Sequence, residues 1–121
     1  MIQAYFIFLK NIASASHLVR EFRLLREFIG VSRGFIRFAV KFIDDSELHV
    51  FEHVDSALHK TDYSYHWQDR EKNMIARWDN SPHHPEVETF PHHMHIRETV
   101  RAIKEPTFLD VLKKIESSMG D

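Results

Sequence analysis

Hydrophobic and polar residues alternate along two stretches in the middle of the chain. Residues 35–43 alternate, a polar turn follows, and residues 47–54 alternate again. Alternation with a period of two residues is typical of a strand that buries one face. Residues 62–68 and 73–79 repeat this arrangement around a second polar turn. The pattern therefore predicts two β-hairpins.

The two ends of the chain carry helical patterns. Residues 2–12 have apolar side chains on every face, which predicts a short helix packed into the core. Residues 107–119 follow Pro106 and carry an apolar stripe at helical spacing, which predicts a C-terminal helix. Residues 17–29 fit a helix and a strand equally well, so local periodicity does not decide their structure. Together these patterns predict an α+β fold, with an antiparallel meander sheet of four to five strands and an N-terminal and a C-terminal helix packed on one face.

The hairpins divide their side chains between two faces of the predicted sheet. One face is apolar and aromatic and is expected to form the core: Ile36, Phe38, Val40, Phe42, Leu48, Val50, Val54, Tyr63, Tyr65, Trp67, Met74, Ala76 and Trp78. The other face carries Arg37, Lys41, His49, His53, Ser64, His66 and Arg77. A polar face is ordinary for an antiparallel sheet, because one side commonly contacts water. Cations gathered with imidazoles also predict a binding surface, in which we assign Arg37, Lys41 and His49 to binding.

The composition narrows the classes of function. The chain has 121 residues, which predicts one domain over residues 1–121. Its 16 Lys and Arg against 18 Asp and Glu give no overall attraction to nucleic acid, so any cationic surface has to be local. The absence of Cys excludes disulfides and thiolate chemistry. No segment reaches the ~20 apolar residues of a membrane span, and the apolar start lacks a signal-peptide pattern, so a cytoplasmic protein without membrane contact is expected.

Histidines are concentrated in one part of the sequence. Six of the ten lie between His66 and His95. Three prolines within this segment forbid a regular helix and disfavour a central strand, which predicts a stiffened loop. Asp79 and Asn80 close the preceding strand, and the side chain of one or the other is expected to accept backbone amides of the loop. Imidazole binds metals and moves protons near neutral pH, so the concentration predicts chemistry.

One chemistry that fits is metal-free cleavage of RNA by general acid–base catalysis. The reaction needs a base for the 2′-hydroxyl proton, an acid for the leaving 5′ oxygen, and cations around the phosphorane. Imidazoles with a pKa near ~6.5 serve as base and acid, and Arg holds phosphate oxygens. No cofactor is required. The candidate residues are His66, Arg77, His83, His84, His92, His93 and His95.

Two alternatives remain open. His93 and His95 would project from the same side of an extended strand. With His83, or else His84 or Glu86, they could hold zinc or another divalent metal, as in a metal-dependent hydrolase. Alternatively, the cationic face and the loop form a non-enzymatic surface for nucleic acid or a protein, with the histidines satisfied by carboxylates and backbone. Spacing does not choose between these interpretations.

A longer motif resembles a known family. The run YSYHWQD at 63–69 is followed by RWDNSPHHPE at 77–86 and by TFPHHMH at 89–95. This combination resembles the TumE-type toxins of prokaryotic toxin–antitoxin modules, and a looser match extends from about Gly34 through the C-terminal helix. The matching positions are His66, Arg77, Asp79, Asn80, His83, His84, Glu86, His92, His93 and His95.

The resemblance implies a small toxin that an antitoxin, often a DNA-binding protein, neutralises by direct association. It implies growth inhibition, with RNA cleavage as the proposed activity and RNA as the substrate. Asp79, Asn80 and Glu86 are expected to take part in binding. The resemblance also implies a helix followed by an antiparallel sheet and a closing helix, which favours a strand at 17–29. A homo-oligomer is compatible with these expectations.

Overall fold

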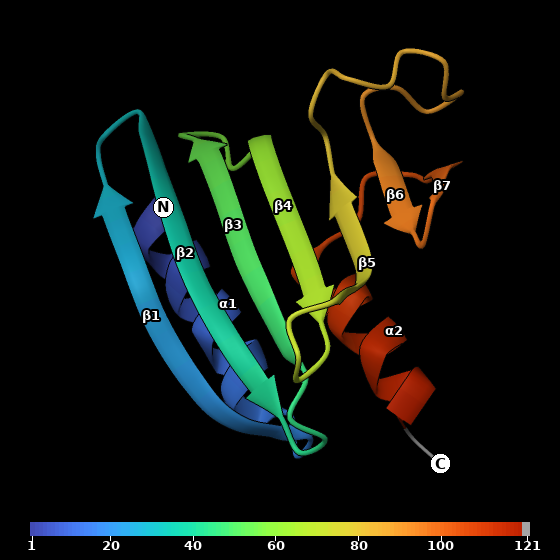
Figure 1. Cartoon of the computed structure of the whole chain (residues 1–121). Helices are drawn as coiled ribbons and strands as arrows, with labels where there is room; N and C mark the ends of the chain where they lie inside the picture. The colour runs from blue at the N-terminus through green and yellow to red at the C-terminus, as the bar shows by residue number, and fades with distance from the viewer. Residues whose placement is uncertain (120–121) are drawn as a thin grey trace.

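The sheet of the protein is a single meander of seven antiparallel strands. In the computed structural model, which describes residues 1–119, each strand pairs with its neighbours in the sequence (Figure 1). The elements in order are α1 (Ile2–Ala15), β1 (Val19–Ile29), β2 (Arg33–Phe42), β3 (Glu47–Asp55), β4 (Lys60–Gln68), β5 (Met74–Asp79), β6 (His93–Ile96), β7 (Thr99–Ala102) and α2 (Phe108–Met119). The α+β meander with a helix at each end is therefore confirmed, and the sheet has more strands than the four to five expected.

Both helices pack into one core with the sheet. Phe6 of α1 and Phe108 of α2 are fully buried together with Phe38 of β2. The Phe108 ring meets the Phe38 ring edge-on, with 5.2 Å between the centroids. Thr107 caps α2, since its hydroxyl accepts the amide of Asp110 while the Asp110 carboxylate accepts the amide of Thr107. Within residues 1–119, no helix is both long enough and apolar enough to span a membrane.

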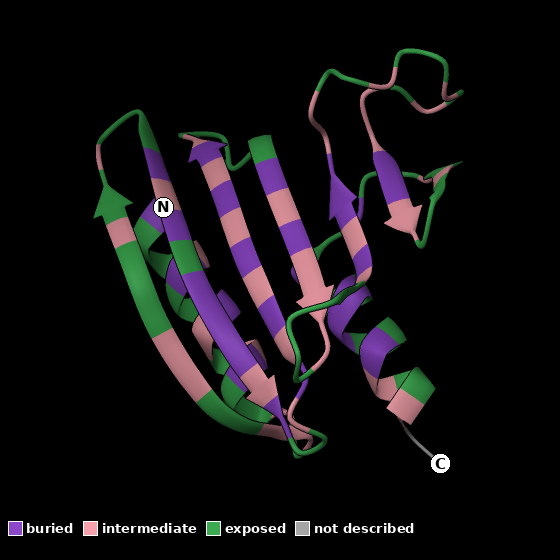
Figure 2. Cartoon of the chain, in the orientation of Figure 1, coloured by how far each residue is buried: buried purple, intermediate pink, exposed green. Residues whose placement is uncertain are grey.

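Burial alternates along the central strands, as the sequence pattern predicts (Figure 2). In β3, Leu48 and Val50 are buried while His49 between them faces away from the helices. Each large aliphatic side chain buried in this way stabilises the fold by about 1.5–3 kcal/mol. Met74 departs from the predicted core and is 37 % exposed, because an irregularity between Trp67 and Gln68 shifts the pairing at the start of β5.

The ambiguous segment 17–29 forms an edge strand. Within residues 1–119, β1 pairs with β2 alone and so lies at one edge of the sheet. Its apolar side chains Leu24, Leu25, Phe28 and Ile29 are 44 to 53 % exposed. The periodicity of the segment is mixed because neither face of β1 is deeply buried, so no strict alternation is required there.

The last part of the histidine segment forms a strand, as the metal interpretation assumes for His93 and His95. His93–Ile96 form β6, which pairs with β5, and Thr99–Ala102 form β7 at the second edge of the sheet. The expectation that the whole segment is a loop is therefore wrong for its last part. The prolines do not interrupt the pairing, because the last of them precedes β6 and the residues before it form only turns.

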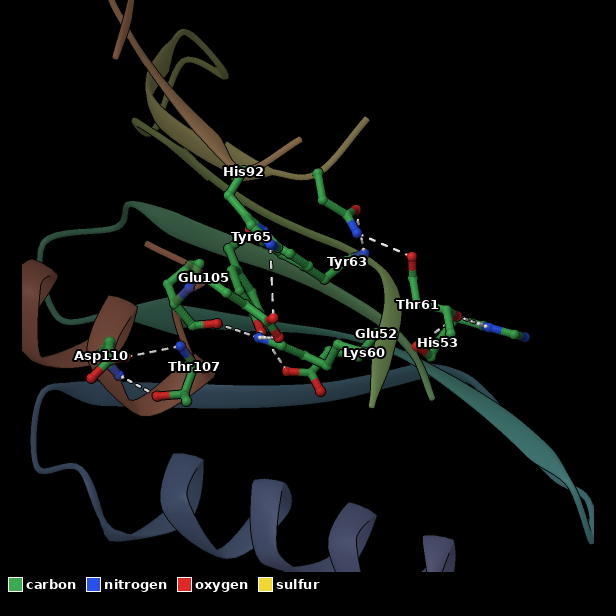
Figure 3. Close-up of polar contacts among 12 residues, drawn as sticks. Glu52, His53, Lys60, Thr61, Tyr63, Tyr65, His92, Glu105, Thr107 and Asp110 are labelled. Carbon is green, nitrogen blue, oxygen red and sulfur yellow. Dashed lines mark hydrogen bonds and ion pairs between the residues drawn. The ribbon is translucent and has the colours of Figure 1, made fainter. Parts of the chain in front are cut away.

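The core face holds a polar cluster that apolar patterning does not predict. Glu52 is fully buried, and its carboxylate accepts hydrogen bonds from the hydroxyls of Tyr5 and Tyr65, each at 2.5 Å. Lys60 donates to the Tyr65 hydroxyl at 2.7 Å (Figure 3). It also donates to the carbonyl of Pro106. Burial raises the pKa of Glu52 and lowers that of Lys60, and the charge of each partly offsets the shift of the other. The cluster joins α1, β3 and β4 to the segment that leads into α2.

Replacing Glu52 by leucine should destabilise the fold. Glu52→Leu leaves the hydroxyls of Tyr5 and Tyr65 without their acceptor. It also removes the carboxylate that acts most strongly on the Lys60 ammonium, which keeps only the more distant pairing with Glu105 at 3.9 Å. We expect the free energy of unfolding to fall by about 3 kcal/mol, as for the loss of one partner of a buried pair. Urea denaturation followed by circular dichroism measures the change. The control Glu71→Leu, on the exposed turn before β5, should change it by less than about 0.5 kcal/mol. Equal effects of the two substitutions would contradict a structural role for the cluster.

Candidate functional site

Strand register aligns four polar side chains across the sheet. His49 of β3 pairs with His66 of β4, which pairs with Arg77 of β5. Arg77 in turn pairs with His95 of β6. Residues directly opposite one another in antiparallel strands carry their Cβ atoms about 4.5–5.5 Å apart on the same face. The four side chains, which we call the polar row, therefore lie side by side on the face turned away from the helices.

A hollow lies along the polar row over the middle of the sheet. Its polar lining includes Arg37, His49, His66 and Arg77, and Phe51 belongs to its apolar lining. The Arg37 guanidinium lies over the Phe51 ring, 4.2 Å from the centroid. A guanidinium stacked in this way keeps the N–H groups in its plane free for a ligand. The hollow therefore brings two guanidinium groups and two imidazoles together.

The charges around the two imidazoles differ. Burial lowers the pKa of His66, and the neighbouring charges of Arg77 and His49 lower it further. Nδ1 of His66 lies 3.4 Å from Nη1 of Arg77. Nε2 of His49 lies instead 3.1 Å from the carboxylate of Glu47, which also pairs with Lys41 at 3.7 Å. One imidazole thus borders a cation and the other an anion.

The carboxylate of Asp79 joins the polar row to the histidine segment. Asp79 is only 4 % exposed, although it lies on the face turned away from the helices. Its Oδ2 accepts a hydrogen bond from Nε of Arg77 at 3.0 Å, and its Oδ1 accepts the amide of Ser81 at 3.0 Å. Burial raises the pKa of Asp79, but these hydrogen bonds outweigh burial and hold the pKa below its usual value. Asp79 therefore remains charged and begins the loop as expected.

Three imidazoles meet beside Asp79. His93 and His95 project from β6, and His84 reaches them from the loop 80–92. The ring centroids are 4.8 Å apart for His93 and His95, 4.9 Å for His84 and His93, and 5.3 Å for His84 and His95. One nitrogen of each ring lies within 4.8 Å of one nitrogen of each of the others. We call these three residues the histidine cluster.

His93 is the most enclosed member of the histidine cluster. Its side chain is fully buried, and its Nδ1 donates to the carbonyl of Pro91 at 2.9 Å. Its Nε2 lies 3.0 Å from Oδ1 of Asp79 but outside hydrogen-bond geometry, and no residue in 1–119 is its hydrogen-bond partner. Burial lowers the pKa of His95, and the Asp79 carboxylate, 3.7 Å from Nε2 of His95, opposes this shift.

Two of the predicted histidines lie outside both groups. His83 is exposed, and the position that the metal interpretation gave it is taken by His84. His92 lies with the core-facing side chains, where its Nδ1 and the hydroxyl of Tyr63 are hydrogen-bonded at 2.8 Å (Figure 3). Of the five histidines between 83 and 95, the structure thus brings only three together.

Asn80 and Glu86 contact other parts of the site. The side chain of Asn80 accepts the amide of Tyr63 at 3.0 Å and donates to the carbonyl of Thr61 at 3.0 Å. These bonds fasten the start of the loop to β4. Glu86 accepts a hydrogen bond from Nδ1 of His84 at 3.0 Å and so orients that imidazole.

The polar face expected from the sequence omits Leu25, Phe51 and Gln68, which line the hollow, and Glu47, which contacts His49. Phe51 was not assigned to the polar face because it is aromatic, and Glu47 was not assigned because it begins its strand. Both follow from the alternation of β3, in which every second residue from Glu47 onward faces away from the helices. Strict parity along the strand, without regard to polarity, would have found them.

Comparison with known proteins agrees with the resemblance of the central motif. The family model described as Toxin TumE matches residues 8–119, a span that contains the whole sheet, the polar row and the histidine cluster. No match was found among curated proteins or among solved structures. The chain therefore belongs to the TumE toxin family, and it is the toxin component of a toxin–antitoxin module with an antitoxin as its partner.

Proposed function

We propose that this toxin inhibits growth by cleaving RNA, without a metal, through acid–base catalysis in the hollow along the polar row. His66 acts as the base and His49 as the acid, while Arg37 and Arg77 bind the scissile phosphate. The observation that carries the proposal is the direct cross-strand pairing of two imidazoles in a hollow that two guanidinium groups also line. The histidines of the segment 83–95 are the other candidates for a partner of His66, and the nearest of them along the row, His95, lies beyond Arg77.

The reaction is a transfer within the RNA strand. The base removes the proton of a 2′-hydroxyl, and the 2′ oxygen attacks the adjacent phosphorus. The bond from phosphorus to the 5′ oxygen breaks as the new bond forms, and the acid gives its proton to the leaving oxygen. The products are a 2′,3′-cyclic phosphate and a 5′-hydroxyl. Base and acid exchange their protonation states, so the next turnover begins after they exchange a proton with water.

The surroundings of His66 suit a base. A base has to be neutral before it can accept a proton, and the pKa of His66 lies below the ordinary 6.5. The imidazole therefore stays neutral at pH 7. A guanidinium only donates, so in the free protein Nδ1 of His66 accepts an N–H of Arg77 and the proton of the neutral ring lies on Nε2. Nδ1 takes the 2′-hydroxyl proton when Arg77 turns to the phosphate. Arg77, whose charge helps to lower the pKa of His66, would also bind the phosphate.

The surroundings of His49 suit an acid. A carboxylate only accepts hydrogen bonds, so the contact with Glu47 places a proton on Nε2 of His49. This leaves Nδ1 as the nitrogen that can face the substrate. When His49 is an imidazolium, Nδ1 carries the proton that the leaving oxygen requires. A neutral His66 beside a protonated His49 is the pair of states with which the reaction begins.

Arg37 and Phe51 supply the means of binding RNA. Guanidinium N–H groups bind two phosphate oxygens at once, and the free edge of Arg37 is available for this. The stacked ring and guanidinium also offer a flat surface to an unpaired nucleobase. A base in a duplex is already stacked on its neighbours. We therefore expect single-stranded RNA to be the preferred substrate.

Cleavage should depend on His66 and on the 2′-hydroxyl of the substrate. Untagged protein in EDTA should cut a single-stranded RNA and leave a 2′,3′-cyclic phosphate, which mass spectrometry identifies. His66→Ala should lower the rate by about 10²–10⁴-fold. His53→Ala is the matched control, because His53 lies on the same face but is bonded to Thr61 at 2.7 Å, outside the hollow. Its rate should stay within about twofold of the wild type.

Three results would count against this activity. The wild type, folded by circular dichroism, could leave single-stranded and structured RNAs intact. It could cut a DNA strand of the same sequence as fast as the RNA. His66→Ala could keep the rate of the wild type. Any of these would reject the proposed chemistry.

The pH dependence of cleavage should show the lowered pKa of His66. Because the base works in its neutral form, kcat/KM should rise with pH through a midpoint below 6.5. Arg77→Gln removes the neighbouring cation, so it should move this midpoint upward in addition to lowering the rate. The rate of RNA cleavage, measured from about pH 4 to about pH 9 on either side of the ordinary imidazole pKa, tests both the midpoint and its shift. A midpoint at or above 6.5, unchanged in Arg77→Gln, would contradict the assignment of His66 as the base.

A further inference from the structure

The histidine cluster holds three nitrogen atoms that can converge on one point. The cluster does not take part in the proposed acid–base pair, which lies on β3 and β4. Each of its members offers one ring nitrogen within 4.8 Å of those of the others. Two nitrogen atoms that each lie about 2.0–2.1 Å from one metal ion are at most about 4.2 Å apart, slightly closer than this. Small movements of the rings would therefore suffice to coordinate one ion.

The hydrogen bonds of His93 leave one nitrogen without a partner. A backbone carbonyl only accepts, so Nδ1 of His93 carries the proton of its contact with Pro91. In the neutral ring Nε2 then has a lone pair and no proton. This lone pair is fully buried, without a hydrogen-bond partner, and 3.0 Å from a carboxylate oxygen of Asp79 that also has only lone pairs. A cation bound at Nε2 would satisfy both groups.

His84 has the same arrangement. Its Nδ1 bonds to the Glu86 carboxylate at 3.0 Å, which leaves Nε2 as the free nitrogen. Metal-binding histidines commonly donate their other ring N–H to a carboxylate or a backbone carbonyl, which fixes the ring and its tautomer. Glu86 and the Pro91 carbonyl do this for His84 and His93. The carboxylate of Asp79, beside both β6 histidines, supplies negative charge for a cation.

We propose that His84, His93 and His95 bind one divalent metal ion of the zinc class. The inference goes beyond the proposed function, because the ion is held apart from the imidazoles that act on RNA. Three nitrogen donors suit zinc and its transition-metal neighbours, whereas magnesium and calcium prefer oxygen. His84 and His95 are partly exposed, so water has access to one side of the ion. The ion would fasten the loop 80–92 to β6.

Zinc binding by untagged, metal-stripped protein tests the site. Isothermal titration with Zn²⁺ should give one ion per chain. Co²⁺ should give the visible absorption bands of a nitrogen-coordinated ion. His84→Ala should weaken binding more than about 100-fold, and Glu86→Gln, which removes only an orienting group, about tenfold. His83→Ala is the matched control, because His83 is adjacent and exposed but outside the cluster, and its binding should equal that of the wild type.

His95→Ala is the second ligand variant, because a change at the fully buried His93 would also disturb the fold. His95→Ala should lose zinc as His84→Ala does, with the circular dichroism spectrum unchanged. Absence of stoichiometric binding by the wild type would overturn the inference. Equal losses in His83→Ala and His84→Ala would do the same, since they would indicate diffuse binding to surface imidazoles.

The proposed zinc site and the proposed RNA cleavage are tested by separate assays, so either can be rejected without the other. The zinc titration contains no RNA, and the cleavage assay is run in EDTA. Zinc binding with no cleavage in EDTA, but with cleavage restored by Zn²⁺ and lost in His84→Ala, would support the metal site and overturn metal-free catalysis. Cleavage in EDTA by a protein that binds no zinc would do the reverse.

Discussion

Strand register is the constraint on which the rest of the structure depends. A slip of one residue in an antiparallel strand turns every side chain to the opposite face. In β3 such a slip would bring His49 under the helices and expose Leu48 and Val50. The pairing that buries the core is therefore also the pairing that lines up the polar row. The helices hold this register in place, because they cover the apolar face of the sheet and leave the other face open.

The sheet carries a buried carboxylate on each face, and their surroundings differ. Burial raises the pKa of both, but only that of Glu52 stays above the ordinary value. Glu52 accepts hydrogen bonds mainly from neutral tyrosine hydroxyls, whereas Asp79 receives a guanidinium N–H and a backbone amide. Asp79 therefore stays charged and can anchor cations, while Glu52 connects one helix to the sheet. Two acids of similar burial thus have different roles.

The sequence predicts the parts of this fold that depend on local periodicity. The hairpins, the C-terminal helix and the two faces follow from alternation or from helical spacing, since burial imposes these patterns on neighbouring residues. β6 could not be found in this way, because it has only four residues and its most buried side chain, His93, counts as polar. His83 and His84 are adjacent in the sequence, and only the path of the loop decides that His84 turns towards β6. Contacts of this kind are tertiary and leave no periodic signal.

The meander also sets the order in which the protein can be assembled during translation. Every strand pairs with its neighbours in the sequence, so β1 to β3 can form hairpins while later segments are still being added at the ribosome. The polar row needs one residue from each of four consecutive strands, and the last of these strands follows the loop 80–92. The pairing of the N-terminal strands therefore does not depend on this surface, whereas the surface depends on a strand that is synthesised later.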